Sequence, residues 1–318
     1  MKTVKEFDVV IIGGGAAGLF ACHLLSGLNI KTAVIEKNQR VGKKILATGN
    51  GKCNLSNKDM CLSNYFGDRS FIKQVFDESP QKIIFEEFDK IGIEICANEE
   101  NKIYPKSMQA SSVLDSLRFS IEEHGGTIIS DANVVSVEKS KNKFFVRTPS
   151  SVEEFACKSI IVSIGGISGI ERQDKNFFEF IKKLGHRVIE PMPSLVQLKL
   201  EGNLHKSMEG NKWFAGASVY DNENLLASDK NEILFTEYGI SGNAILNISR
   251  YAVELLRSKR AAILSIDLFP EESVNETKTN VEKRRKNLKK RKMENFFNGW
   301  LNKRIGMALI KSCYIELS

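Results

Sequence analysis

Apolar positions in the first half of the chain follow two periods, one typical of buried strands and one typical of helices. Residues 7–12 form a short apolar run next to a glycine cluster, a pattern typical of a buried parallel strand. Residues 16–28 have helical character, and residues 31–35 predict a second strand that ends at Glu36. The order strand, tight turn, helix, strand predicts one βαβ unit and an α/β fold class. The same patterns predict helices over 71–90 and 111–124, and strands over 127–129, 134–137, 144–148 and 159–164.

The pattern changes after Pro191 and Pro193, which predicts a second domain. Alternating positions predict strands over 194–200, 213–220, 232–236 and 261–268, with a helix over 243–256. We therefore expect a domain with a parallel sheet over 1–190 and a mainly β domain with a helical segment over 191–318. Apolar residues late in the second domain have the spacing of an amphipathic helix: Met293, Phe296, Phe297, Trp300, Leu301 and Ile305.

The composition is globular and changes this picture little. The chain has 318 residues, of which 42% are hydrophobic and 27% charged, enough for two domains of ordinary size. No apolar run reaches the roughly 18 residues needed to span a bilayer, so we expect no membrane partner. The six cysteines contain no C-x-x-C pair. This favours reduced thiols in a cytoplasmic protein over a disulfide framework or a metal site.

The net charge of +7 comes from one segment. Residues 282–292 contain eight of the 46 basic residues and one of the 39 acidic residues, which leaves 38 of each elsewhere. Such a run can follow the phosphate backbone of an RNA, or it can be a solvated helix face. The sequence leaves both interpretations open.

A dinucleotide-binding motif follows the first predicted strand. Gly13, Gly15 and Gly18 give the pattern G-x-G-x-x-G between a strand and a helix, which is the context that the motif requires. The first glycine permits the tight turn, the second lets a pyrophosphate approach the backbone, and the third allows close packing of helix and strand. Glu36, 23 positions after Gly13, can bind the hydroxyls of an adenosine ribose and would repel a 2′-phosphate. The motif therefore predicts FAD or NAD and does not decide between them.

The connection over 38–66 is long, polar and rich in glycine and asparagine, which indicates a functional or a mobile loop. Its stretch GKKILATGNGKCN, at 42–54, together with GGGAAGLFA and the following NLSN, resembles the HI0933-like family of FAD-dependent oxidoreductases. Further blocks over 101–113, 163–168, 184–198 and 234–246 resemble segments of the same family in the same order. The resemblance extends over nearly all of 7–270.

The resemblance implies a Rossmann-like FAD-binding domain over 1–190 with an inserted β-rich domain, and NAD(P)H as a transient electron donor. It implies reduction of an activated C=C bond, with uridine in 23S ribosomal RNA as the leading substrate, which would make ribosomal RNA a partner. A small-molecule flavin oxidoreductase that acts on a steroid-like enone or an amine is the alternative. Because family members continue beyond the point that matches Ser318, we also expect the closing segment of the FAD domain to be missing. An inactive, truncated FAD- or RNA-binding relic is therefore a third interpretation.

The motif and the resemblance together predict the cofactor contacts. Lysine replaces the family's arginine at Lys43 and Lys52, and both side chains can hold a phosphate or simply be solvated. After Ser168 the chain reads GIERQDKNFFEF, where the family has a glycine-rich segment. The predicted contact residues are Gly13, Gly14, Gly15, Ala16, Ala17, Gly18, Glu36, Lys37, Lys43, Lys44, Thr48, Gly49, Gly51, Lys52, Asn54, Val135, Gly165 and Gly166.

Cys53 is the candidate catalytic residue. Reduction of a C=C bond needs a general acid, and a thiol between Lys52 and Asn54 can have a tuned pKa. The alternative is that Cys53 packs beneath the flavin as a small residue. The histidines are predicted to be structural: His23 as a core or surface residue, and His124 and His205 outside any metal or triad cluster.

Overall fold

The computed structural model describes residues 3–78, 81–149, 153–168 and 178–313. The chain divides into two compact units, Met1–Ile189 and Glu190–Ser318. Each unit is described by itself.

The first unit is built on a six-stranded sheet of order β6-β2-β1-β9-β8-β7. The strands β1 (Thr3–Ile12), β2 (Thr32–Ile35), β6 (Thr127–Ile129) and β9 (Glu153–Val162) are parallel. The strands β8 (Lys143–Arg147) and β7 (Ser136–Ser140) continue the sheet as an antiparallel pair. This mixed sheet confirms the predicted α/β class and parallel sheet.

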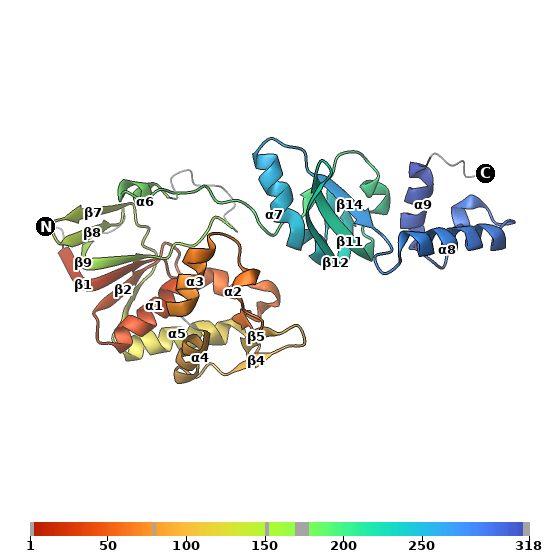
Figure 1. The fold of residues 1–318 in the computed structure, drawn as a ribbon. Helices are drawn as coiled ribbons and strands as arrows, with labels where there is room; N and C mark the ends of the chain where they lie inside the picture. The colour runs from red at the N-terminus through yellow and green to blue at the C-terminus, as the bar shows by residue number, and fades with distance from the viewer. Residues whose placement is uncertain (1–2, 79–80, 150–152, 169–177, 314–318) are drawn as a thin grey trace. The chain divides into compact units, whose positions relative to one another are not determined.

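The last part of strand β1, residues 10–12, is buried on both faces because neighbouring side chains enter different cores. Ile11 belongs to a core with α1 (Ala16–Gly27) and α5 (Ala110–Glu123), whereas Val10 and Ile12 belong to a core with the β7–β8 pair. Figure 1 shows α1 and α5 side by side along one face of the sheet. A continuous apolar run, rather than an alternating one, follows from this two-sided burial.

Shorter elements occupy the stretch between β2 and α5. They are α2 (Lys43–Leu46), the 3₁₀ turns Gly49–Gly51 and Leu62–Asn64, α3 (Arg69–Glu78) and α4 (Gln81–Lys90), and a small sheet of order β3-β5-β4 with β3 (Ser56–Asn57), β4 (Ile95–Ala97) and β5 (Lys102–Pro105). The single helix predicted over 71–90 is wrong. Two helices, α3 and α4, are present, and positions 79 and 80 between them lie outside the described residues.

The second unit is a five-stranded antiparallel sheet of order β10-β13-β12-β11-β14. Its strands are β10 (Leu198–Lys199), β11 (Lys212–Asp221), β12 (Asn224–Thr236), β13 (Gly239–Ser241) and β14 (Ile263–Asp267). Helix α7 (Asn243–Arg257) packs its apolar side on this sheet through Ile245, Ile248 and Ala252 (Figure 1). The seven-residue strand predicted over 194–200 is wrong, since only Leu198 and Lys199 pair with β13.

The predicted amphipathic helix over 293–305 is also wrong, although its side chains do pack in the core. Helix α8 (Val274–Asn287) precedes a 3₁₀ turn, and α9 (Lys303–Ser312) begins after Asn302, whose side chain caps it. Gly299 lies between them at φ 79°, a left-handed conformation that interrupts a helix. Leu301 and Ile305 are nevertheless buried in the core of this unit.

Candidate dinucleotide-binding site

The carboxyl ends of three neighbouring parallel strands meet at one edge of the first unit's sheet. The glycine turn follows β1, Glu36 follows β2, and Ser163 follows β9. The backbone N–H of Gly13 donates to the Ile35 carbonyl at 2.8 Å, and that of Ser163 donates to the Ile12 carbonyl at 2.8 Å. Strand β1 lies between β2 and β9. The carboxyl edge of such a sheet is where open α/β folds bind ligands.

The three glycines of the motif differ in what surrounds them. A Cβ at Gly13, whose φ is 108°, would lie 2.6 Å from the Ser163 carbonyl oxygen, and one at Gly18 would collide with the Gly13 carbonyl. A Cβ at Gly15 would have no heavy atom within 4 Å. The first and third glycines are therefore required by the protein's own packing. The space at the second is open, as the approach of a pyrophosphate requires. Gly15 also caps α1 without a side-chain hydrogen bond, which leaves the first N–H groups of the helix for an anion.

Glu36 is buried and held by backbone donors. Its side chain accepts hydrogen bonds from the N–H of Gly14 at 2.8 Å and the N–H of Asn38 at 2.9 Å, and a further one from the Asn38 amide group. An ionised carboxylate has about four acceptor positions, so the oxygen Oε2 keeps one for a ribose hydroxyl. The acid thus lies beside the glycine turn in a fixed orientation, and these residues fit the adenosine half of a dinucleotide.

Helix α2 brings the loop after Glu36 to the same edge. The N–H of Gly42 donates to the Gly14 carbonyl at 2.7 Å, and a side chain at Gly42 would collide with Leu114 of α5. The Lys44 ammonium donates to the Gly166 carbonyl at 2.6 Å. Three of the predicted segments, around 13–18, 42–44 and 165–166, are therefore in contact.

The other predicted contact residues lie on the first turn of α1, on the loop after β2 and beside β7. Ala16 and Ala17 form the exposed first turn of α1, and Gly49, Gly51 and Thr48 belong to or flank the 3₁₀ turn after α2. Val135 is 53% exposed, and its N–H pairs with the Arg147 carbonyl. The remaining side chains are exposed: Lys37, Lys43, Lys52 and Asn54.

Cys53 lies inside the protein rather than on the open side of the loop. It is 7% exposed and belongs to the core that includes Leu19, Val41 and Ile45. Its N–H donates to the Thr48 hydroxyl at 3.2 Å, and its φ is 60°, which is uncommon for a residue other than glycine. Burial raises the pKa of the Cys53 thiol, so the thiol stays protonated at neutral pH. This placement favours the packing interpretation, and the acid role stays a prediction.

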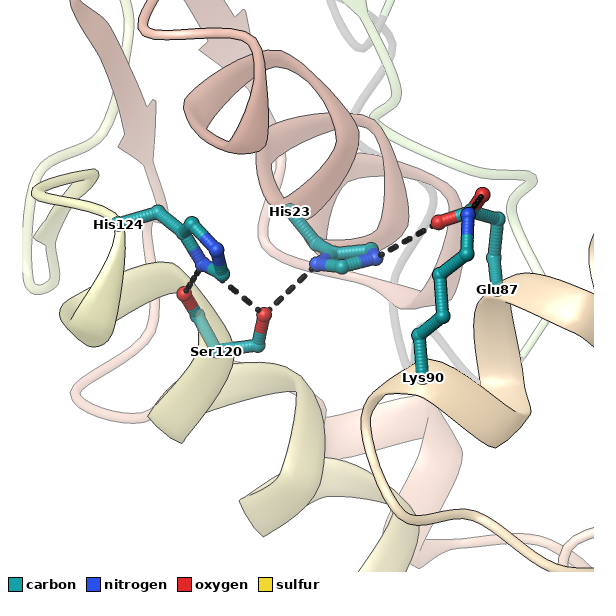
Figure 2. Close-up of polar contacts among 5 residues, drawn as sticks. All are labelled: His23, Glu87, Lys90, Ser120 and His124. Atoms are coloured by element: carbon teal, nitrogen blue, oxygen red, sulfur yellow. Dashed lines mark hydrogen bonds and ion pairs between the residues drawn. The ribbon is translucent and has the colours of Figure 1, made fainter.

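The structure also contains a polar cluster that the sequence did not predict. Figure 2 shows His23 of α1 between Glu87 of α4 and Ser120 of α5, with Lys90 and His124 at the two ends. His23 Nδ1 lies 2.8 Å from the Ser120 hydroxyl, and Nε2 lies 3.6 Å from a Glu87 oxygen, beyond hydrogen-bond distance. These residues line a cavity of about 760 Å³ between the three helices. Only the spacing of Ser120 and His124, one turn apart on α5, was visible in the sequence.

Proton positions in this cluster follow from its acceptors. His124 Nδ1 lies 2.7 Å from the Ser120 carbonyl, which can only accept, so His124 carries its proton on Nδ1. The Ser120 hydroxyl is then free to donate to His23 Nδ1, which places the proton of a neutral His23 on Nε2, facing Glu87. Burial lowers the pKa of His23, against the opposing effect of Glu87. Within the described ranges, no three His, Cys, Asp or Glu side chains gather as metal ligands, and no helix is long and apolar enough to cross a membrane.

A strand, a glycine turn and a helix, with an acid anchored at the end of the next parallel strand, define the Rossmann class of α/β protein. The model of the HI0933-like protein Rossmann domain matches residues 7–298, and the chain belongs to that family. The resemblance predicted from the sequence motifs is thereby confirmed.

Two kinds of known relatives are similar to this chain in sequence. The chain is 31% identical over 265 residues to a 3-dehydro-bile acid delta(4,6)-reductase of Clostridium scindens. The aligned region covers 82% of this chain and 64% of that protein. It is 28% identical over 276 residues to the ribosomal RNA dihydrouridine synthase of Haemophilus influenzae, covering 84% of this chain and 65% of that protein. The chain thus spans less than two thirds of the length of these relatives.

Solved structures match this chain only with low TM-scores. Thermovibrio ammonificans THI4 matches with a TM-score of 0.39 and 12% identity, over 76% of this chain and 79% of that one. The L-proline dehydrogenase from P. horikoshii matches with a TM-score of 0.32 and 17% identity, over 51% of this chain and 23% of that one.

Proposed function

We propose that this chain binds FAD and reduces an activated C=C bond, with uridine in ribosomal RNA as the leading substrate. The observation that supports it most is the convergence of the glycine turn, Glu36 and the Lys44–Gly166 contact at the carboxyl edge of the sheet. Glu36 would hold the ribose, and the start of α1 would hold the pyrophosphate. A bound FAD would supply the hydride, and NAD(P)H is proposed as its transient source.

The two relatives support the class of reaction more than the substrate. One is named for reduction of a bile-acid double bond and the other for formation of dihydrouridine in RNA. Both names describe saturation of a C=C bond, which needs a hydride donor and a proton donor. The proton donor here is proposed to be either Cys53 or water.

The charge of the second unit supports RNA. One of the eight basic residues in 282–292, Arg284, makes structural contacts and is only half-exposed. Its guanidinium donates hydrogen bonds to the carbonyls of Phe296 and Asn298 and lies over the Trp300 ring. The other seven are exposed: Lys283, Arg285, Lys286, Lys289, Lys290, Arg291 and Lys292. Four of the eight basic residues lie on helix α8 and four follow its end, and a merely solvated surface needs no such density of one charge.

The second candidate is a reductase of a small enone, and the higher identity to the bile-acid enzyme favours it.

Purified chain would be titrated with FAD, then tested anaerobically for reoxidation of reduced flavin by each substrate class. Dihydrouridine in 23S ribosomal RNA would be compared between cells with and without the gene. Loss of dihydrouridine without the gene supports the RNA substrate. Reoxidation by an enone with unchanged RNA supports the second candidate, and a chain that does not retain FAD contradicts both and favours a relic.

A further inference from the structure

Helix α2 is only four residues long, yet three other parts of the first unit hold it in place. Its N-cap residue, Gly42, donates a backbone hydrogen bond to Gly14 in the turn after β1. The same glycine lies against Leu114 of α5 so closely that no side chain would fit there. Ile45 of α2 is buried in the core beneath the sheet. The helix is therefore a fixed base, and Lys44 projects from it.

The turn after β9 is held at both of its ends. At the first end, the Ser163 hydroxyl donates to the Gly13 carbonyl at 2.9 Å and the Ser163 N–H donates to the Ile12 carbonyl. At the other end, the Lys44 ammonium donates to the Gly166 carbonyl at 2.6 Å, across 122 positions of sequence. Gly165, between these ends, has a φ of 73°, and a Cβ there would lie 3.6 Å from the Lys44 nitrogen.

We propose that Lys44 is a positioning residue of the dinucleotide site, which acts on bound FAD through the Gly165–Gly166 turn and not by contact with a phosphate. The proposal rests on the proposed function, because it concerns FAD. The Lys44 ammonium is directed to a carbonyl, and a hydrogen bond from a charged donor is stronger than a neutral one. Lys43 and Lys52, which are also exposed, remain the lysines of this loop that we predict to contact phosphate.

The physical effect of this contact is to order the turn before the cofactor binds. A turn with two adjacent glycines has many accessible backbone conformations, and fixing them costs free energy on binding. The Lys44 contact incurs that cost during folding, which leaves the turn ready for the ligand. Removing the contact should therefore loosen the turn in the cofactor-free chain and weaken FAD binding as a consequence.

The experiment measures the turn and the cofactor separately. ¹⁵N relaxation would be recorded on the cofactor-free chain for wild type, Lys44→Gln, Lys44→Arg and the charge-matched control Lys58→Gln, an exposed lysine of the same unit. In Lys44→Gln, the order parameters of Ile164–Ile167 are expected to fall from about 0.85 towards about 0.6. Lys44→Arg keeps an N–H donor and is expected to restore them, whereas Lys58→Gln changes nothing. Because Lys44 is exposed, all variants should fold, which thermal melting checks.

FAD titrations at low and high salt give the second measurement. Lys44→Gln is expected to weaken FAD binding about threefold to tenfold, equally at both salt concentrations, because the lost hydrogen bond joins two parts of the protein and not the protein to a phosphate. A loss that disappears at high salt would indicate a direct phosphate contact and overturn the proposal. An unchanged order parameter of the turn in Lys44→Gln would overturn it as well. If wild type binds no FAD, the proposed function fails, while the relaxation data still decide whether Lys44 orders the turn.

Discussion

The carboxylate of Glu36 illustrates how single side chains determine the chemistry of this edge of the sheet. A lone acid after a parallel strand is a weak signal. Two backbone N–H groups, from Gly14 and Asn38, turn it into a fixed acceptor beside the glycine turn. Its fixed charge is the reason to expect a ribose without a 2′-phosphate.

Replacing Glu36 by glutamine should weaken FAD retention by about 1–3 kcal/mol, the scale of hydrogen bonds to a charged group. The amide also turns an NH₂ group towards backbone donors, which adds to the loss. Isothermal titration with FAD measures the effect, and Asp89→Asn, an exposed acid of the same unit, is the control for charge. If Glu36→Gln retained wild-type affinity, the assignment of the ribose to Glu36 would be wrong.

For Cys53 the sequence allows an acid role and a packing role, and the buried placement of the side chain favours packing. Because its side chain lies in the core, Cys53→Ala should lower the free energy of unfolding by about 1 kcal/mol. We expect substrate reduction to be almost unchanged, since the thiol belongs to the same buried core as Leu19 and Ile45. Denaturant unfolding and anaerobic turnover are the two measurements. A fall in turnover of about a hundredfold or more in a folded Cys53→Ala variant would instead establish Cys53 as the acid.

At the scale of helices, His23 connects α1 to α4 and α5. The groups that face it are Glu87 and Lys90 from α4 and Ser120 and His124 from α5. Since burial lowers the pKa of His23, the fold binds the neutral form. The stability that this provides is present above the unfolded pKa of about 6.5 and is lost as the pH falls towards the lower folded value.

The free energy of unfolding should therefore fall as the pH drops below about 6.5, with a slope of at most about 1.4 kcal/mol per pH unit from this one group. His23→Gln should remove that part of the slope, because glutamine keeps a donor and an acceptor and does not titrate. Urea unfolding across this pH range measures it, with the exposed His186→Gln as control. An unchanged slope in His23→Gln would contradict the assignment. The hydrogen bond from Lys90 is the main cause that lowers the pKa of Glu87. The free energy of unfolding should therefore fall further below about pH 4.5, as Glu87 becomes protonated.

The elements that the sequence predicted well are those with a strong local cause. The run over 7–12, the glycine turn and the helix after it are encoded within thirty residues, and they appear as β1 and α1. The small sheet of β3, β4 and β5 was missed because its strands are two to four residues long and pair across the loop, as Ser56 does with Ile103. The contact of Lys44 with Gly166 was equally invisible, because only the folded sheet brings together residues 122 positions apart.

At the scale of the whole molecule, the charge is unevenly shared. The excess of seven positive charges lies in one segment of the second unit, and the rest of the chain is neutral. Electrostatic attraction to a nucleic acid should therefore be a property of the second unit, whereas cofactor binding should be a property of the first.

Neutralising Lys289, Lys290, Arg291 and Lys292 to glutamine should weaken binding to a 23S ribosomal RNA fragment and reduce the dependence of log K on log salt, because fewer counterions are released. Fluorescence anisotropy over a range of salt concentrations measures both. The matched control neutralises four exposed lysines elsewhere in the same unit: Lys199, Lys206, Lys259 and Lys303. If both variants lost RNA affinity equally, or if the 289–292 variant lost none, the basic segment would be a solvated surface and not an RNA-binding site.

The pairing of β1 with β9 also governs when the site can form during synthesis. Val9 pairs with Ser159, so the first strand of the sheet waits for a partner that is made 150 residues later. At about 5–20 residues per second, this delay is roughly 8–30 s on the ribosome. Throughout it, the apolar strand β1 lacks its central neighbour and offers an unpaired edge. Expression at lower temperature or with added chaperone should therefore raise the yield of folded protein.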